Sequence, residues 1–352
     1  MTEPDFHAEA SALAARAWNA SVAVTSVAPL AGDASSRRYF RIGLRAAPEP
    51  TAVLMVQSGS GLSISSDELS SVVEPPDEMP FLNVQRYLRR QGIDVPEVYA
   101  ADPPRGLALL EDVGDTTLWD AARAAGDPAA LFRAAIEQLV ALQLAGAERP
   151  DPDCIAFRQR FDARLFLWEF EHFLEYGFSG RTLSSRDQGS LRRHFEDLAA
   201  ELADGAEALT HRDYHSWNLF VHRGRIRTID FQDALLAPVP YDLATLLNDR
   251  ATPTIVDPVL ERVLVAHFRA TRAEAMGETL RPELFLPRYY LLVLQKSLKI
   301  VGRFHYLEDV KGKQGYVAML PHTFATLRRC FENLPALDDL RAILTRAFPE
   351  IR

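Results

Sequence analysis

The chain has 352 residues, a net charge of −9 and 25% charged residues, an ordinary globular composition that is long enough for two lobes. The negative balance and the lack of a long basic run disfavour nucleic acid as the main partner and give no signal for a membrane surface. No apolar run approaches the roughly 18 residues of a transmembrane helix, and two cysteines do not make a disulfide framework. The acidic start lacks the features of a signal peptide, so we expect a cytoplasmic protein. We also expect a monomer.

The first part of the chain predicts a small sheet with few helices. Apolar stripes at helical spacing predict helices over 5–19 and 81–91, the second ending at Gly92. Alternating residues predict five strands, over 22–30, 38–44, 52–57, 96–100 and 107–110. The stretch 58–78 is rich in Ser, Gly, Pro and acid and is expected to be a mobile surface loop. We assign residues 1–112 to an N-terminal lobe.

Residues 113–352 predict a second, mainly helical lobe. Helices are expected over 116–125, 128–146, 156–176, 185–204, 240–249, 255–276, 282–307, 312–332 and 335–347. A hairpin interrupts them, with strands over 220–222 and 225–229 joined by the two-residue turn Arg223-Gly224. The predicted class is therefore α+β, with an antiparallel N-terminal sheet and a helical C-terminal lobe.

Two segments beside this hairpin carry the chemistry. Residues 211–218 read His-Arg-Asp-Tyr-His-Ser-Trp-Asn, and an Asp230-Phe231 pair follows the second strand. The first segment fits H-R-D-x-x-x-x-N and the second places an Asp at a strand end, as in protein-kinase-like phosphotransferases. Asp213 would orient or accept the proton of an attacking hydroxyl. Asn218 and Asp230 would hold Mg²⁺ against the phosphates of ATP, since Mg²⁺ prefers oxygen ligands.

With these segments placed, the chain resembles the aminoglycoside phosphotransferase and choline kinase superfamily over nearly its whole length. Within that superfamily it looks most similar to the anomeric kinases that phosphorylate N-acetylmuramate and N-acetylglucosamine in bacterial cell-wall recycling. The segments that carry this resemblance are 32–41, 92–98, 110–115 and 295–304. It implies a bilobal protein-kinase-like fold, ATP and Mg²⁺ as cofactors, and an amino sugar as the small-molecule partner. The product would be a sugar 1-phosphate.

The nucleotide site is expected in the N-terminal lobe. The turn 32–39 would cover the phosphates through Gly32, Ser35, Ser36 and backbone amides, with Arg37 or Arg38 adding charge. The connector would read the purine through the backbone of Glu111 to Val113. The third strand departs from the kinase pattern, because it has Met55 where a lysine usually holds the phosphates. Arg38 or Arg41 are then candidates to replace that charge.

The acceptor site is expected in the C-terminal lobe. His215 and Asp233 would lie toward the substrate. Gln295, Lys299 and Arg303 share one face of a predicted helix, and Lys299 and Arg303 could bind the lactyl carboxylate of N-acetylmuramate. A plain solvated face is the competing interpretation of this stripe.

Two alternatives stay open. Another kinase of the same scaffold, acting on an aminoglycoside, a choline-like acceptor or homoserine, would share the motif but call for an acidic pocket. A pseudokinase would bind nucleotide without catalysis, and only the absent strand lysine favours it.

Overall fold

The computed structural model of the chain describes residues 6–30, 37–57 and 78–352. The chain forms two compact units. The first comprises Met1–Asp115, Asp151–Ala156 and Phe220–Asp233, and the second comprises Thr116–Pro150, Phe157–Leu219 and Ala234–Arg352. Nearly all of the loop predicted over 58–78 lies outside the described residues.

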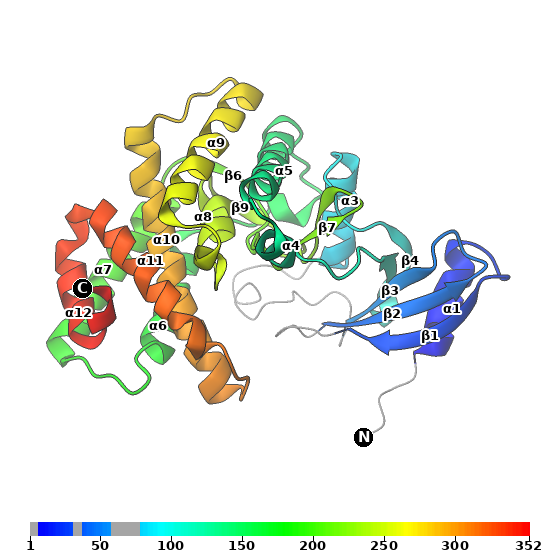
Figure 1. Cartoon of the computed structure of the whole chain (residues 1–352), viewed down its shortest axis with the longest axis horizontal. Coiled ribbons are helices and arrows are strands. Elements are labelled where there is room, and N and C mark those ends of the chain that lie inside the picture. Colours follow the sequence, from blue (N-terminus) through cyan, green and yellow to red (C-terminus); the bar gives the residue numbers. More distant parts are fainter. Residues whose placement is uncertain (1–5, 31–36, 58–77) are drawn as a thin grey trace. The chain divides into compact units, whose positions relative to one another are not determined.

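A five-stranded antiparallel sheet in the order β1-β2-β3-β5-β4 forms the centre of the first unit (Figure 1). Its strands are β1 (Ala23–Pro29), β2 (Arg37–Arg45), β3 (Thr51–Gln57), β4 (Val98–Asp102) and β5 (Leu107–Glu111). Successive side chains of a strand point to opposite faces, and Phe40, Ile42 and Leu54 pack on one face against Leu13 of α1 (His7–Ala17). Each such buried side chain contributes about 1.5–3 kcal/mol, so this face fixes the register of β2.

The register of β2 decides which of its side chains share the opposite face. Arg37 pairs with Gln57 of β3, and Tyr39 pairs with Met55. Since the core face takes Phe40 and Ile42, the odd-numbered residues of β2 lie on the other side of the sheet. This face therefore carries Arg37, Tyr39 and Arg41.

The first unit also contains a helix and a hairpin. The helix α3 (Pro80–Arg90) meets the end of the hairpin through Phe81 and Phe231, whose ring centroids lie 4.8 Å apart. The strands β7 (Leu219–His222) and β8 (Arg225–Thr228) confirm the predicted hairpin. Its turn has φ of 51° at Arg223 and 75° at Gly224, the two positive values that a tight hairpin of this type requires.

The second unit is mainly helical, as predicted, and its long helix α10 (Pro282–His305) packs against α6, α8 and α11 (Figure 1). The other helices are α4 (Leu118–Ala124), α5 (Ala129–Glu148), α6 (Ala163–Tyr176), α7 (Ser185–Ala203), α8 (Tyr241–Asn248), α9 (Pro258–Met276), α11 (Leu320–Asn333) and α12 (Asp338–Ala347). A short antiparallel pair, β6 (Glu207–Thr210) with β9 (Leu235–Pro238), was not predicted from the sequence. It matters because β6 leads directly into residues 211–218.

Two helices begin seven and eight residues later than the sequence predicts. The predicted 156–176 helix starts only at Ala163, because the side chain of Asp162 accepts a hydrogen bond from the backbone N–H of Leu165 and caps it there. The predicted 312–332 helix starts at Leu320, because Gly312 and Gly315 take positive φ values of 68° and 97°.

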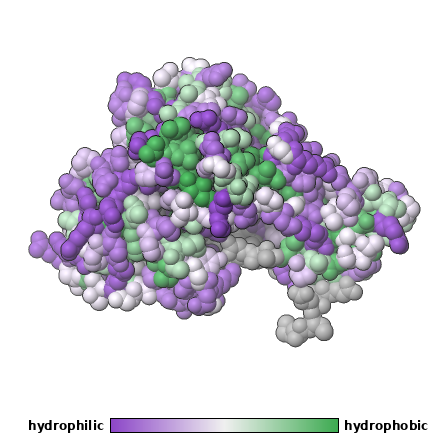
Figure 2. Space-filling view, viewed as in Figure 1, coloured by the Kyte–Doolittle hydropathy of each residue, from purple (hydrophilic) through white to green (hydrophobic). Residues whose placement is uncertain are grey.

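The helix α5 is long and apolar enough to cross a membrane by length and composition, the one such helix among the described residues. Half of that apolar stretch is buried, and the helix packs against α9 and β6. This is the pattern of a core helix. Figure 2 shows hydrophobic residues gathered on the visible face of the second unit, where α5, α8 and α9 lie in Figure 1.

Candidate active site

The predicted catalytic loop, residues 211–218, joins β6 to β7. Hydrogen bonds to the first turn of α8 hold it in place. The backbone N–H groups of His211 and Arg212 donate to the two carboxylate oxygens of Asp242, at 2.6 and 3.0 Å. These two hydrogen bonds hold Arg212 at φ 78°, a left-handed conformation that costs a non-glycine residue about 1–2 kcal/mol. Burial raises the pKa of Asp242 to about 6. The loop is thus fixed by an interaction that the motif itself does not contain.

Asp213 follows this strained residue and is partly buried in a cationic environment. Burial alone would raise its pKa, but Arg212, Lys299 and Lys296 together hold the pKa of Asp213 well below its usual range. The carboxylate therefore stays ionised throughout the neutral range. A fixed, ionised carboxylate can orient a hydroxyl and accept its proton.

The rest of the loop gives Asn218 and His215 different roles. The side-chain amide nitrogen of Asn218 donates to the backbone carbonyl of Asp213 at 3.0 Å, so its oxygen is the atom that remains to act as a ligand. Burial lowers the pKa of His215 to about 4, so this imidazole is neutral at pH 7. Its Nδ1 is buried without a hydrogen-bond partner in the described part of the chain. An unsatisfied buried nitrogen of this kind suits a substrate contact.

Helix α10 supplies two of the cations that lower the pKa of Asp213, and one of them, Lys296, is a residue that the sequence did not single out. Lys296 is 7% exposed, and its ammonium donates to the hydroxyl of Tyr241 at 3.1 Å and to the carbonyl of Arg212 at 3.4 Å. Burial lowers its pKa. Lys299 instead forms an ion pair with Glu169 of α6, a residue that is fully buried. The guanidinium of Arg303 lies 5.4 Å from the ring centre of Tyr306.

In the first unit, Asp230 is the centre of a charged cluster. It has φ 62°, and its carboxylate accepts a hydrogen bond from Nη2 of Arg37 at 2.9 Å. The amide of Gln232 donates to Asp230 at 3.2 Å and to Asp233 at 2.7 Å, which links the two predicted carboxylates. The side chain of Asp230 is 36% exposed, while that of Arg37 is 3% exposed. The carboxylate is therefore both held and accessible, as a metal ligand needs to be.

The other predicted arginines of β2 have different partners. The guanidinium of Arg38 lies over the rings of Phe6 and Phe40, at 5.2 and 5.8 Å from their centres. Arg41 binds Asp112 and Asp115 through hydrogen bonds of 2.7 to 3.0 Å. Gly32, Ser35 and Ser36 lie outside the described residues.

The predicted connector borders a cavity of about 210 Å³ in the first unit. Glu111, Asp112 and Gly114 line this cavity together with residues of the β2–β3 turn, β4 and the β7–β8 turn. Val113 is buried. The side chain of Glu111 accepts a hydrogen bond from Arg227 at 2.9 Å, and its backbone N–H donates to the carbonyl of Glu97 at 2.8 Å.

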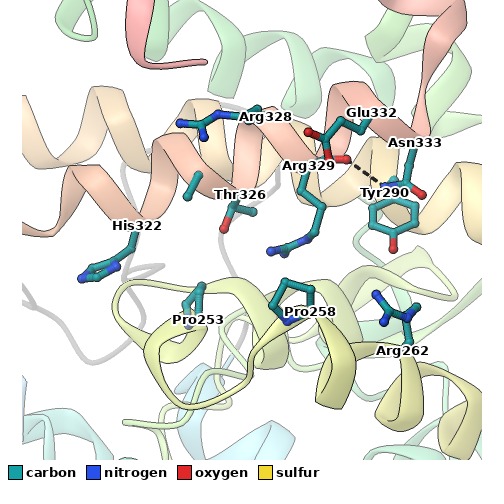
Figure 3. Close-up of a pocket in the computed structure, with 11 residues that line it drawn as sticks. Pro253, Pro258, Arg262, Tyr290, His322, Thr326, Arg328, Arg329, Glu332 and Asn333 are labelled. Atoms are coloured by element: carbon teal, nitrogen blue, oxygen red, sulfur yellow. Dashed lines mark hydrogen bonds between the residues drawn. The ribbon is translucent and has the colours of Figure 1, made fainter. Parts of the chain in front are cut away.

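A larger cavity, of about 460 Å³, lies in the second unit (Figure 3). Arg329, Thr326 and His322 of α11 face Pro258 and Arg262 across it. Of the described residues that line it, none is a predicted site residue. Arg329 is already paired with Glu261 and Asn248, at 3.1 and 2.6 Å. The cavity therefore does not belong to the catalytic loop.

Comparisons with known proteins agree with this geometry. A family model described as "Phosphotransferase enzyme family" matches residues 26–278. An N-acetylmuramate/N-acetylglucosamine kinase from Caulobacter vibrioides is 30% identical over 91% of both chains. A kinase with the same description from Neisseria meningitidis is 30% identical over 89% of this chain and 88% of its own. The solved choline kinase from Cryptosporidium parvum has a TM-score of 0.59 at 12% identity and covers 91% of each chain, which shows the fold.

Proposed function

Because the chain belongs to the phosphotransferase enzyme family and is an ATP-dependent phosphotransferase, we propose that it phosphorylates the anomeric hydroxyl of an N-acetylated amino sugar. The acceptors would be N-acetylmuramate, N-acetylglucosamine or both, and the product a sugar 1-phosphate in peptidoglycan recycling. The names of two relatives that align over about nine tenths of the chain support the acceptor class.

The observation that carries the chemistry is the state of Asp213. Its carboxylate is fixed on an anchored loop, and the surrounding cations keep its pKa below the usual range. Such a group is a weak base, so it would orient the hydroxyl and take its proton only as the new P–O bond forms. An anomeric hydroxyl is more acidic than an ordinary alcohol and would tolerate this weak base.

We assign the metal to Asn218 and Asp230. The oxygen of Asn218 is left for a ligand because its nitrogen is bonded to Asp213, and the carboxylate of Asp230 is partly exposed. These oxygen donors fit Mg²⁺, which usually takes one or two protein ligands and completes its shell with water and phosphate. When bound, Mg²⁺ would neutralise charge on the phosphates.

The acceptor would be recognised beside α10. Lys299 is already paired with Glu169, so Arg303 is the better candidate for the lactyl carboxylate of N-acetylmuramate. His215, neutral at pH 7, would accept a hydrogen bond from the sugar or donate one to it. Asp233, which accepts a hydrogen bond from Gln232 in the Asp230 cluster, would also contact the substrate.

The test is a ³¹P NMR assay with ATP and Mg²⁺ that offers N-acetylmuramate, N-acetylglucosamine, an aminoglycoside and choline separately. We expect a sugar 1-phosphate signal that falls by about 10²- to 10⁴-fold in Asp213→Asn, the range for loss of a general base. A phosphomonoester from the aminoglycoside or choline alone would overturn the acceptor while keeping the phosphotransferase. Bound ATP without transfer to any acceptor would favour a pseudokinase.

A further inference from the structure

The chain lacks the usual cation for the phosphates of a nucleotide in its first unit. Its four lysines are Lys296, Lys299, Lys311 and Lys313, all in the second unit. In kinase-like folds a lysine of the third strand binds the phosphates and pairs with a glutamate of the following helix. Here β3 has no lysine, and α3 has no Asp or Glu. Among the described residues of β3 and α3 both halves of that pair are missing, which leaves the arginines of the first unit as candidates for the charge.

Geometry selects among the arginines at the start of β2. Arg38 lies on the core face, over Phe6 and Phe40. Arg41 is bound to two carboxylates, Asp112 and Asp115. Arg37 is on the face opposite the core, and its guanidinium contacts Asp230.

We propose that Arg37 is the residue that binds the phosphates of the nucleotide, in place of the strand lysine. This inference rests on the proposed function, because it takes Asp230 as a metal ligand. A guanidinium is planar and always charged, and it matches phosphate oxygens with two parallel hydrogen bonds. Arg37 is 5% exposed, and a buried cation is costly without an anion beside it. Asp230 supplies that anion when no nucleotide is bound.

The ion pair with Asp230 also positions the guanidinium of Arg37. A kinase lysine is positioned by a helix glutamate, whereas Arg37 is positioned by the proposed metal ligand itself. Because the metal and Arg37 would share one carboxylate, the phosphates supply the extra negative charge that both cations need. Nucleotide affinity should therefore depend on Arg37 in proportion to the number of phosphates.

The experiment measures dissociation constants of ATP, ADP and adenosine by calorimetry, with Mg²⁺ and with EDTA. The variants are Arg37→Gln, Arg37→Lys and Arg38→Gln, with Arg45→Gln at the exposed end of β2 as the matched control. We expect Arg37→Gln to weaken ATP and ADP by about 10- to 100-fold, the range for one charged contact, and to leave adenosine unchanged. Arg37→Lys keeps the charge but not the fork, so its loss should be smaller.

The outcomes separate this inference from the proposed function. Wild-type protein that binds no ATP would overturn both. If wild type binds ATP, then unchanged ATP affinity in Arg37→Gln, an equal loss for adenosine, or a loss carried by Arg38→Gln would each overturn the role of Arg37. Circular dichroism checks folding. Should Arg37→Gln not fold, Arg37→Lys decides, because a role in phosphate binding requires weaker ATP and unchanged adenosine.

Discussion

At the scale of single residues, Asp213 of the predicted catalytic loop depends in part on charges that lie far from it in sequence. Asp213 is ionised because Arg212, Lys299 and Lys296 outweigh its burial. The motif names Asp213, but the two lysines come from a helix about eighty residues later. A catalytic carboxylate with a lowered pKa should keep working as the pH falls, which suits a phosphotransferase that needs no strong base.

Asp242 should make the stability of the second unit depend on pH. An unfolded Asp has a pKa of about 3.9, and burial raises the pKa of Asp242 to about 6. A raised folded-state pKa means that the stabilising contribution is complete below about pH 4 and is lost as the pH rises through 6. The loss amounts to roughly 2–3 kcal/mol at 1.36 kcal/mol per pKa unit.

Asp242→Asn is the matched variant, since it keeps one acceptor for the loop but cannot titrate. We expect the unfolding free energy of wild type minus that of Asp242→Asn to fall by this amount between pH 4 and pH 7. Urea unfolding at several pH values, followed by tryptophan fluorescence, measures the difference. A difference that stays constant with pH would contradict the assignment.

At the scale of elements, an ion pair ties α6 to α10. Glu169 is fully buried and binds both Lys299 and Gln295, the latter at 2.6 Å. Lys299→Met would leave a buried carboxylate without its cation and should destabilise the protein by about 3–5 kcal/mol. Adding Glu169→Gln should recover much of that loss, because replacing both partners removes the uncompensated charge. Thermal unfolding of the single and double variants tests this, with the exposed Lys311→Met as control. Additive losses would show that the pair does not couple the helices.

The end of α10 should select between the two proposed sugars. Arg303 is partly exposed and lies over Tyr306, while Lys311 lies at the same distance, 5.4 Å, from that ring. Arg303→Ala should lower kcat/KM for N-acetylmuramate by about 10- to 100-fold, as for loss of one charged hydrogen bond, and change N-acetylglucosamine little. Lys311→Ala removes the same kind of contact to Tyr306 and should affect neither sugar. Equal losses on both sugars in Arg303→Ala would refute carboxylate binding.

The sequence could predict these elements only where their signal is local. The hairpin turn Arg223-Gly224 and most of the long helices have such signals, and the structure confirms them. The strands β6 and β9 have only four residues each and pair across 25 positions or more, so no local pattern marks them. The late start of α6 does have a local signal, the capping Asp162 three residues before Leu165.

In the candidate site, too, the sequence predicts the residues of a local motif but not the contacts between distant segments. A contiguous motif marks Asp213, His215 and Asn218, because their spacing is set by one loop. The partner of Asp230 is 193 positions away, and Lys296, which contacts the loop, is recognised only once α10 is packed. Such pairs are products of tertiary packing, and sequence spacing carries no record of them.

At the scale of the whole molecule, the two proposed metal ligands, Asn218 and Asp230, lie on either side of the β7–β8 hairpin in the sequence. If both hold Mg²⁺, then each is needed for the metal to strengthen nucleotide binding. We expect Mg²⁺ to tighten ATP binding to wild type by about tenfold or more, equivalent to about 1.4 kcal/mol. This gain should disappear in Asn218→Ala and in Asp230→Asn alike, as measured by ATP calorimetry with Mg²⁺ and with EDTA.

The comparison of the two variants isolates the metal. Asp230→Asn also weakens the contact with Arg37, so its effect on ATP in EDTA mixes two causes. The side chain of Asn218 instead donates a hydrogen bond to the backbone carbonyl of Asp213, and the described part of the chain shows no contact between Asn218 and Arg37. A Mg²⁺-dependent gain that survives in Asn218→Ala would therefore remove Asn218 from the metal site, whatever Asp230→Asn does. Loss of the gain in both, with ATP affinity in EDTA kept in Asn218→Ala, would support both residues as metal ligands.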